Sequence, residues 1–534
     1  MDRFKGQKLS LNEELRQVEK KLLSLIQKRT RLLAKIASNR MEQNKSPVDT
    51  QLEKNLWNLW KAHLQGENQR FFRQLFSLLN NTSYAKAATS KTSDKPFCLF
   101  PKTKPVDFLG PAPLHLNQAQ IVLVLAAFSS TETHLSPFPL NDPLVEQIKA
   151  LNQMGASISW EENSLHAGPG QITLDNKSIF LGESEFNLYL SIALGLFQAG
   201  SCRLTAGPGL KILNLKPLQD FLPQLGARLT SIEPQSYNLP ARLESSGKVP
   251  KEIILPQNVN PLLGLSLILA AIGLGQKLKL SFKKPFSFLE DLIHLSKSWN
   301  LPLEQQNNTI LVQAKNKILT PAGFKLDADP ILSGYILVLP YLLTGRVKLN
   351  GTWPTYSSEA KLIQVFFDYL KINFVPEELK TSFQGSKVNE FNFDVEQNER
   401  LFPLALAVAI AHKHKSIIYH QLQGKEVLEH GCDLLRTLGF DFYSHPEYLE
   451  LEFKNSSSKE KNLWVSPSPI WTLSYALISF AFKGICMENP GSITYLWPNF
   501  WKVFQAISSE TKTTPKEEEV NAPNKRRRIR IQSH

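Results

Sequence analysis

A loose repeat of about 70 residues is the feature of this chain that most constrains its fold. Five times, a helix-like segment runs into a small turn and then into an amphipathic strand, as in "LNQMGASISW" and "LRTLGFDFYS". Glycine and asparagine at such turns tolerate the left-handed backbone that ends many helices. Because the period is too long for a solenoid, it predicts repeated α/β subdomains, each with two helices and several strands. The turn residues are Gly155, Gly226, Asn300, Lys371 and Gly439, at spacings of 71, 74, 71 and 68 residues.

Length and composition limit the class of protein further. A chain of 534 residues exceeds one hydrophobic core, so two to four domains are expected. Segments such as "FNLYLSIALGLFQAG" and "LFPLALAVAIAHKH" are apolar almost all round and predict buried helices. No uncharged apolar run is long enough to span a membrane, and the charged N-terminus lacks a secretion signal. Four scattered cysteines without a CxxC pair argue against a zinc site or a disulfide framework, which favours a cytoplasmic protein.

The first 90 residues predict a helical domain. Apolar residues between Leu15 and Ile36 recur at three- and four-residue spacing, which predicts one long helix over 10–41. Shorter helices are predicted at about 50–64 and 67–83. The long helix cannot bury its apolar stripe against two short ones, so a homodimer through these helices is expected. Residues 91–107 continue a stretch rich in Ser, Thr, Lys and Pro and are predicted to be a linker.

The positive charge lies at the two ends of the chain. Residues 1–107 carry 21 Lys and Arg against 10 Asp and Glu, and residues 508–534 carry 7 against 4. The net charges are therefore +11 and +3, and the whole chain carries +13, so the central 400 residues are close to neutral. The tail 508–534 is predicted to be disordered, although its basic run Lys525–Arg528 with Arg530 also fits a nucleic-acid patch.

Residues 108–507 resemble 5-enolpyruvylshikimate-3-phosphate (EPSP) synthase and related enolpyruvyl transferases. Three segments carry the resemblance: "DADPILSGYILVLPYLLTG", "LQGKEVLEHGCDLLRTLGFDFYSHPEYLEL" and "KKPFSFLEDLIHL". The resemblance implies an α+β multidomain chain with two lobes of repeated βαβαββ units, an inside-out α/β barrel. Lobe one is expected at about 114–322 and lobe two at about 323–507 with 100–113. The chain is expected to cross between them near 108–114 and 320–325.

The transferase resemblance also implies a site that is only partly retained. Asp329 matches the position of the family's general-base aspartate, and Lys425 and Glu426 match its Lys-Glu pair. Asp329 also fits a helix cap, and the pair also fits the ordinary charges of a helix start. The family's Arg in that motif is Glu429 here, which inverts a charge. Four further positions where the family has cations carry neutral residues here: Leu114, Ala119, Tyr189 and Ile470, with Tyr495 in place of a late Lys.

Residues 10–90 resemble the all-helical chorismate mutases. The segment "LRQVEKKLLSLIQKRTRLLAKIASNR" matches the first helix of that family and "SPVDTQLE" matches the turn into its second. The resemblance implies mutase-like roles for Arg29, Arg40 and Glu53, and Arg29 and Arg40 fit a solvated helix face as well. Other positions depart from the family pattern, with Asn12 and Leu52 where it has arginines.

These observations leave three functional hypotheses. The first is a shikimate-pathway-derived protein that has lost transferase catalysis and has a binding, regulatory or scaffold role. The second is a chain that remains active in aromatic amino-acid synthesis as an EPSP synthase, a chorismate mutase or both. The third is nucleic-acid binding through the basic ends. The expected ligand class is a phosphorylated or carboxylate small molecule, and no cofactor or metal is expected because the clustered histidines lack a completing Cys or acid.

Overall fold

A computed structural model describes most of the chain and divides it into two units, Met1–Pro96 and Phe97–His534. Among the described residues, no helix combines the length and apolar character that crossing a membrane would need. The described residues are 11–42, 50–63, 72, 76, 79–80, 97–101, 104–161, 164–233, 236–283, 288–314, 318–321, 323–422, 424–453, 463–482, 484–487 and 489–508.

The first unit contains the predicted long helix and the first of the two shorter ones. They are α1 (Leu11–Glu42) and α2 (Thr50–His63). Most of the predicted third helix lies outside the described residues. Its described members are helical, and Phe76, Leu79 and Asn80 are buried whereas Phe72 is half-buried. The C-terminal half of α1 contributes Leu33, Ala34 and Ala37 to the same small core. Helix α1 would be about 48 Å long at 1.5 Å per residue, whereas the 14 residues of α2 span less than half of that length.

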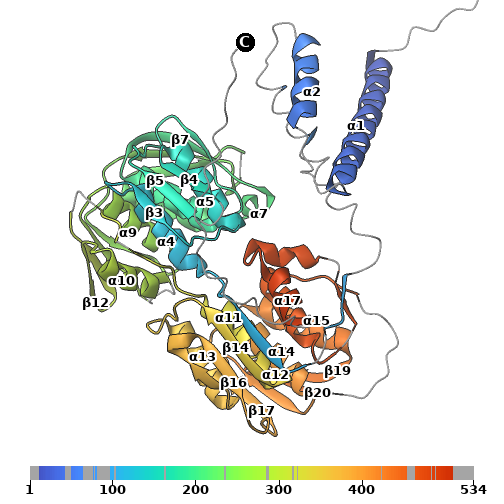
Figure 1. Ribbon diagram of the computed structural model, residues 1–534. Helices are drawn as coiled ribbons and strands as arrows, with labels where there is room; N and C mark the ends of the chain where they lie inside the picture. Colours follow the sequence, from blue (N-terminus) through green and yellow to red (C-terminus); the bar gives the residue numbers. More distant parts are fainter. Residues whose placement is uncertain are drawn as a thin grey trace, which may run out of the picture. The chain divides into compact units, whose positions relative to one another are not determined.

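The second unit is built from six small sheets, three in each of two lobes with separate hydrophobic cores. In Figure 1 lobe one runs from blue-green to olive and lobe two from yellow to red. The sheets of lobe one have the orders β3-β5-β4, β6-β7-β9-β8 and β10-β11-β13-β12, and those of lobe two β15-β16-β14-β2, β17-β18-β20-β19 and β1-β22-β21.

Lobe one repeats a strand–helix–strand–helix–strand–strand unit. In its middle sheet β6 and β7 are parallel, β8 and β9 form an antiparallel pair, and β9 lies between β7 and β8. Its strands are β3 (Thr133–Leu135), β4 (Ser157–Glu161), β5 (Ser164–Gly168), β6 (Ser178–Phe180), β7 (Ala199–Thr205), β8 (Ala227–Ser231), β9 (Ala241–Ser246), β10 (Glu252–Ile254), β11 (Leu278–Ser281), β12 (Leu303–Gln306) and β13 (Thr309–Val312). Its helices are α4 (Leu116–Ala127), α5 (Asp142–Met154), α6 (Glu185–Leu196), α7 (Pro208–Lys211), α8 (Lys216–Phe221), η1 (Leu222–Leu225), α9 (Leu262–Gly273) and α10 (Phe288–Ser298).

Lobe two repeats the same order of elements. Its strands are β1 (Phe97–Leu99), β2 (Val106–Pro111), β14 (Gly345–Asn350), β15 (Asn373–Val375), β16 (Lys380–Phe383), β17 (Phe391–Asp394), β18 (Ser416–Tyr419), β19 (Phe440–Ser444), β20 (Tyr448–Phe453), β21 (Leu463–Trp464) and β22 (Ile485–Met487). Its helices are α11 (Pro330–Leu337), α12 (Leu339–Leu343), α13 (Ser358–Tyr369), η2 (Pro376–Glu378), α14 (Phe402–His412), α15 (Lys425–Leu438), α16 (Pro469–Ile478), η3 (Pro490–Tyr495) and α17 (Phe500–Ser508).

Two strands from the start of this unit complete sheets of lobe two. Strand β2 pairs in parallel with β14, and β1 pairs antiparallel with β22. Figure 1 shows β2, drawn in blue, inside the yellow part of lobe two. Both strands begin within 91–107, so the prediction that this stretch is only a linker is wrong for its second half. Its short apolar runs gain backbone partners that local composition does not show.

The chain passes between the lobes twice, and the two crossing segments pair with each other. Leu114 and Ala328 form an isolated antiparallel bridge. The His115 amide donates to the Asp327 carbonyl at 3.2 Å, and the Asp329 amide donates to the Pro113 carbonyl at 2.9 Å. This pairing is the hinge between the lobes.

The five turn residues of the repeat all adopt the left-handed backbone. Their φ values are +116°, +75°, +47°, +57° and +74° for Gly155, Gly226, Asn300, Lys371 and Gly439. Each turn is followed within three residues by a strand of a different sheet. The repeat in the sequence is therefore the repeat of the fold.

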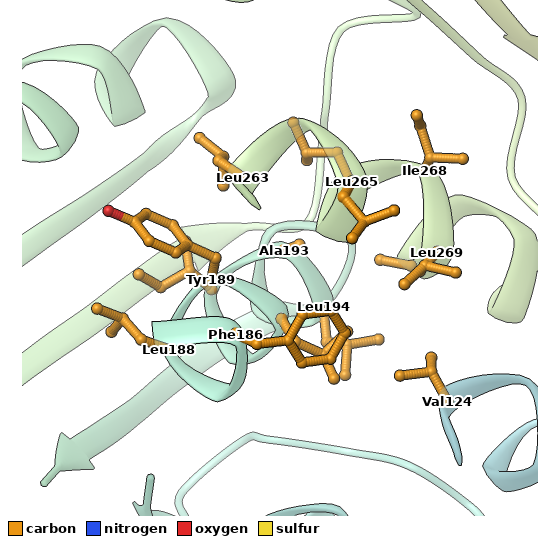
Figure 2. Packing of buried hydrophobic residues seen from close by; sticks show 14 of the residues in the cluster. Val124, Phe186, Leu188, Tyr189, Ala193, Leu194, Leu263, Leu265, Ile268 and Leu269 are labelled. Carbon is orange, nitrogen blue, oxygen red and sulfur yellow. The ribbon is translucent and has the colours of Figure 1, made fainter. Parts of the chain in front are cut away.

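The apolar helices lie in the two cores, as predicted. Every residue of α14 is buried, and α6 is buried from Phe186 onward. Figure 2 shows side chains of α6 and α9 packed together in lobe one, with Val124 of α4 beside them. Burying helices on all sides explains why their sequences show no polar face.

The cysteines correct one expectation. Cys98 of β1 and Cys486 of β22 are opposite each other in the antiparallel ladder and form a disulfide, with Cα atoms 4.0 Å apart. The two other cysteines are free and buried. The sequence separation of 388 residues concealed this pairing, and the cysteines no longer support a reducing compartment.

Candidate functional site

Polar side chains from both lobes meet at the hinge. They come from the start of α4, from α10, from the second crossing segment and from the loop before α13, and all but one are buried. They are His115, Gln118, Asp291, Asp327 and the half-buried Tyr356.

Gln118 and Asp327 form a reciprocal pair. The Gln118 side-chain amide donates to Asp327 Oδ2 at 2.8 Å, and the Asp327 backbone amide donates to Gln118 Oε1 at 2.7 Å. Both interactions are buried, where an unmade hydrogen bond would cost the most. The pair therefore fixes the position of the second crossing segment against α4.

Tyr356 of lobe two joins this pair to Asp291 of lobe one. Its hydroxyl donates to Asp291 Oδ1 at 2.9 Å and approaches Asp327 Oδ2 at 3.4 Å. Burial, together with these two carboxylates, raises the pKa of Tyr356, which keeps the hydroxyl protonated as a donor. His294 stacks on the ring with centroids 3.9 Å apart.

His115 and Asp291 form the most buried part of the network. His115 Nδ1 accepts a hydrogen bond from the backbone amide of Gln118 at 3.4 Å. The other ring nitrogen, Nε2, lies 3.6 Å from Asp291 Oδ1. Because Nδ1 accepts, Nε2 is the nitrogen that carries the ring proton toward the carboxylate. Burial raises the pKa of Asp291 to about 6, although His115 and the Tyr356 hydroxyl oppose the rise. This carboxyl changes its charge close to neutral pH.

A second interaction between the lobes stands beside this network. Glu290 of α10 accepts from both the backbone amide and the hydroxyl of Ser358, at 2.8 and 2.9 Å. Ser358 begins α13, and Ser357 before it makes no side-chain cap bond. A carboxylate from lobe one thus caps a helix of lobe two.

A cavity of about 1000 Å³ opens next to this contact between α10 and α13. Its walls combine charged, amide and apolar groups rather than a cluster of cations. The lining residues from lobe one are Leu289, Glu290, Ile293, His294, Lys297 and Gln305, and those from lobe two include Tyr356, Ser358, Lys361, Glu396, Gln397 and Asn398.

Asp329 lies at the start of α11 with both carboxylate oxygens engaged. Oδ1 accepts the Leu332 amide at 2.9 Å as a helix cap, and Oδ2 accepts from Arg400 at 2.6 Å. Arg400 also donates to Glu359 of α13 at 2.6 Å. One cation is thus held between two acids, and the group carries a net charge of −1. Asp329 therefore caps α11, which is one of the two roles predicted for it.

Lys425 and Glu426 are the first two residues of α15, and both are exposed. Within the described part of the chain neither side chain makes an ion pair or a hydrogen bond. Glu429 is exposed one turn later. Near them the Gly424 amide donates to Glu399 at 2.9 Å, so a further acid lies at this helix start. The structure does not bring this pair into contact with Asp329.

Three of the positions where the family resemblance implies cations lie in the core or close to acidic side chains. Ala119 is fully buried, and Tyr189 is buried with its ring beside the core side chains of α6 and α9 (Figure 2). Burial, with Glu185 nearby, raises the pKa of Tyr189 to about 12. Burial, with Glu146 and two other acids nearby, likewise raises the pKa of Tyr495 to about 12. These hydroxyls are uncharged at neutral pH.

In the helical unit, two of the three predicted site residues lie in one network. Arg29 donates to Asn80 Oδ1 at 2.6 Å, and Asn80 donates to Glu53 Oε1 at 2.9 Å. The Arg29 guanidinium also lies 5.4 Å from the centre of the Phe76 ring. Arg40 lies half-buried in the last turn of α1.

The fold and the hinge define a two-lobed α/β protein of six repeated units, the architecture of enolpyruvyl transferases. A family model described as EPSP synthase (3-phosphoshikimate 1-carboxyvinyltransferase) matches residues 117–504. The chain therefore belongs to the EPSP synthase family.

Relatives and solved structures agree with this assignment. A 3-phosphoshikimate 1-carboxyvinyltransferase 2 from Halalkalibacterium halodurans is 21% identical over 77% of this chain and 94% of its own length. A 3-phosphoshikimate 1-carboxyvinyltransferase from Syntrophobacter fumaroxidans is 19% identical over 72% of this chain and 94% of its own length. The structure of EPSP synthase from Acinetobacter baumannii covers 77% of this chain and 98% of its own, with 12% identity and a TM-score of 0.64, which supports the fold.

Sequence reasoning missed Arg400 and most of the hinge network. Arg400 lies in "EQNERLFP", just before a helix, and nothing in this local sequence indicates that it binds two distant carboxylates. His115 and Gln118 lie between Leu114 and Ala119, two positions that the sequence analysis noted only because they lack the family's cations. Their partners are 176 or more residues away, so only the folded chain shows the network.

Proposed function

We propose that this chain is a non-catalytic member of the EPSP synthase family, which keeps the two-lobed fold and serves as a binding or scaffold protein. The observation that carries the proposal is the neutralisation of Arg400. The guanidinium is bonded to both Asp329 and Glu359, so it has no excess charge to offer an anionic substrate.

Electrostatics explain why this matters. Transfer of an enolpyruvyl group requires phosphoenolpyruvate and shikimate 3-phosphate, both multiply anionic, to be held together. One unit charge at about 5 Å contributes roughly 3 kcal/mol at an effective dielectric of about 20. With Glu429 and the neutral residues Ala119 and Tyr189 at positions where the resemblance implies cations, the chain loses several such contributions. The acids that remain cannot replace them.

The hinge supports the scaffold part of the proposal. Tyr356 and Ser358 of lobe two bond directly to Asp291 and Glu290 of lobe one. The protein's own side chains thus connect the two lobes directly. A pair of lobes held in this way presents a constant surface to a partner.

The proposal is tested by titrating the purified chain calorimetrically with shikimate 3-phosphate and phosphoenolpyruvate, followed by a turnover assay for released phosphate. The enzyme from H. halodurans, assayed in parallel, is the positive control. We expect neither saturable heat nor turnover from this chain. Turnover that disappears in Asp329→Asn would refute the proposal, since it would show a working site at that carboxylate.

A second function is proposed for the helical unit because Arg29 and Glu53 lie in one network through Asn80. A cation beside hydrogen-bonding groups suits a dicarboxylate such as chorismate, the substrate that the mutase resemblance implies. The test is conversion of chorismate to prephenate by the full chain. Arg29→Lys keeps the charge but loses the planar fork, so a real activity should fall sharply in this variant. Activity equal in both proteins would exclude the role of Arg29.

We also propose that α1 dimerises the protein. Its N-terminal half exposes Leu15, Val18, Leu22 and Leu25, each with 48% to 63% of its surface accessible. This stripe is longer than α2 can cover, and a second α1 offers a matching stripe. Light scattering should give a dimer mass for the chain and a monomer mass for Leu22→Lys. The control Lys21→Gln, on a neighbouring exposed position, should remain dimeric. A monomeric parent chain would contradict the proposal.

A further inference from the structure

The exposed face of the sheet β6-β7-β9-β8 carries an unusual row of side chains. The strand register places Ser178 opposite Arg203, Arg203 opposite Arg242, and Arg242 opposite Thr230. All four residues are exposed, so they form one continuous line across the four strands. The line consists of two arginines flanked by two hydroxyls.

Two arginines directly opposite each other work against the sheet. Facing residues of neighbouring strands lie about 5 Å apart at their Cβ atoms, and like charges there are destabilising. The Arg203 guanidinium makes no ion pair or hydrogen bond with any residue that the structure describes. Arg242 is only partly balanced, by Glu244 at 3.2 Å and by the Ser201 hydroxyl at 3.2 Å. The row therefore has excess positive charge and guanidinium donors that face solvent.

The surroundings form a shallow hollow rather than a flat surface. It has a volume of about 420 Å³ and is lined by Asn176, Lys177, Ser178, Ser201, Cys202, Arg203, Ile232 and Arg242. Lys177 is bound to the Met154 carbonyl at 2.9 Å and adds a fixed positive charge at the edge. None of these residues belongs to the hinge network or lines the cavity between the lobes.

The strands beneath the row hold it in place. Cys202 and Leu204 of β7 and Leu243 of β9 alternate with the arginines and are buried in the core of lobe one. The backbone positions of Arg203 and Arg242 are thus fixed by packing on the opposite face of the sheet. A site of this kind loses little backbone freedom when it binds.

We propose that this row binds a phosphate group, either inorganic phosphate or the end of a phosphomonoester. A guanidinium offers parallel donors that match phosphate oxygens, and two of them share the charge of a dianion. Ser178 and Thr230 add hydroxyl donors on either side. Bound phosphate neutralises the facing arginines, so binding relieves a repulsion that the free protein contains. Glu244 remains paired with Arg242 and orients its side chain.

The test compares three chains in which one arginine of this sheet face becomes glutamine. Arg203→Gln and Arg242→Gln remove one charge from the row. Arg228→Gln is the matched control, since Arg228 is exposed on β8 in the neighbouring row opposite Glu244. Binding of inorganic phosphate and of glycerol 1-phosphate is followed by calorimetry, at constant ionic strength because simple screening would otherwise mimic binding.

We expect saturable binding of at least one of the two probes to the parent chain and to Arg228→Gln, and affinity at least about tenfold weaker in both row variants. Tighter binding of glycerol 1-phosphate would identify an organic phosphate as the natural ligand, and equal binding would identify free phosphate. Loss of affinity in all three variants alike would reveal only a diffuse positive field. That result, or the absence of saturable binding, would overturn the proposal.

Thermal denaturation gives a second measurement that does not depend on detecting a small heat of binding by calorimetry. Without phosphate, Arg203→Gln should melt at or above the temperature of the parent chain because one repulsion is gone. With phosphate, the parent chain should gain stability and the variant should not. If Arg203→Gln melted well below the parent chain without phosphate, Arg203 would be a structural residue and the proposal would fail.

Discussion

Replacing Arg400 with glutamine should destabilise lobe two strongly. The guanidinium joins the starts of three helices, because Asp329 caps α11, Glu359 lies in the first turn of α13 and Arg400 itself precedes α14. Glutamine keeps a donor at that position but removes the charge. Two carboxylates would then face each other without a cation between them.

The size of the effect follows from burial. The side chains of Asp329 and Glu359 are only 3% and 17% exposed, whereas that of Arg400 is 37% exposed. Breaking a fully buried ion pair costs about 3–5 kcal/mol. Because solvent reaches one edge of the guanidinium, we expect a loss below this range, about 2–3 kcal/mol in the free energy of unfolding.

The assay is urea denaturation of the parent chain, Arg400→Gln, Glu359→Gln and the double variant at pH 7.5. Because Glu359→Gln removes one of the two repelling acids, the double variant should lose less than the sum of the single losses. A loss below about 0.5 kcal/mol, typical of an exposed substitution, would refute the idea that this group fastens lobe two.

Three shorter predictions test other parts of the structure. Burial raises the pKa of Asp291 from 3.8 to about 6, so the native state binds this proton more tightly than the unfolded chain and stability falls as pH rises from about 4 through 6. Asp291→Asn can still accept a hydrogen bond from Tyr356, so it should remove this pH dependence. At pH 8 its free energy of unfolding, measured in urea titrations, should exceed that of the parent chain by up to about 3 kcal/mol. An unchanged pH dependence would assign the effect to another group. The unfolded, unreduced chain should show two reactive thiols and Cys98→Ser should show three, whereas four in the parent chain would contradict the bond to Cys486. Ala119→Arg should lose more than about 4 kcal/mol or fail to fold, because it buries an unpaired cation in the core of lobe one, and a stable Arg variant would show that this position still opens to solvent.

The repeat explains how much of the fold the sequence could predict. A left-handed residue at each helix end is a local requirement, so Gly155 and Gly439 signalled their turns without knowledge of the partner strands. The apolar sequence of α14 likewise predicted that this helix is buried. Strand β1 could not be predicted, because three residues gain their role only from pairing with β22, 388 positions later.

The sequence predicted less of the candidate site than of the fold. Local reasoning found Asp329 and its helix-capping role, because a cap depends on residues within one turn. It did not find that Arg400 holds the second carboxylate oxygen from 71 positions away, or that Tyr356 reaches Asp291 across the lobes. A charged side chain indicates that an interaction exists, but sequence does not specify its partner.

The replaced residues lie near the starts of helices, which gives a physical reason for the proposed loss of catalysis. Ala119, Tyr189, Ile470 and Glu429 lie in the first or second turn of α4, α6, α16 and α15, where the helix dipole is positive. Cations there bind substrate anions at the expense of stability, since they repel the dipole and each other. Once anion binding is no longer selected, apolar and acidic replacements at these positions stabilise the same helices. On this proposal, the loss of anion binding and the close packing of these helices are two results of the same replacements.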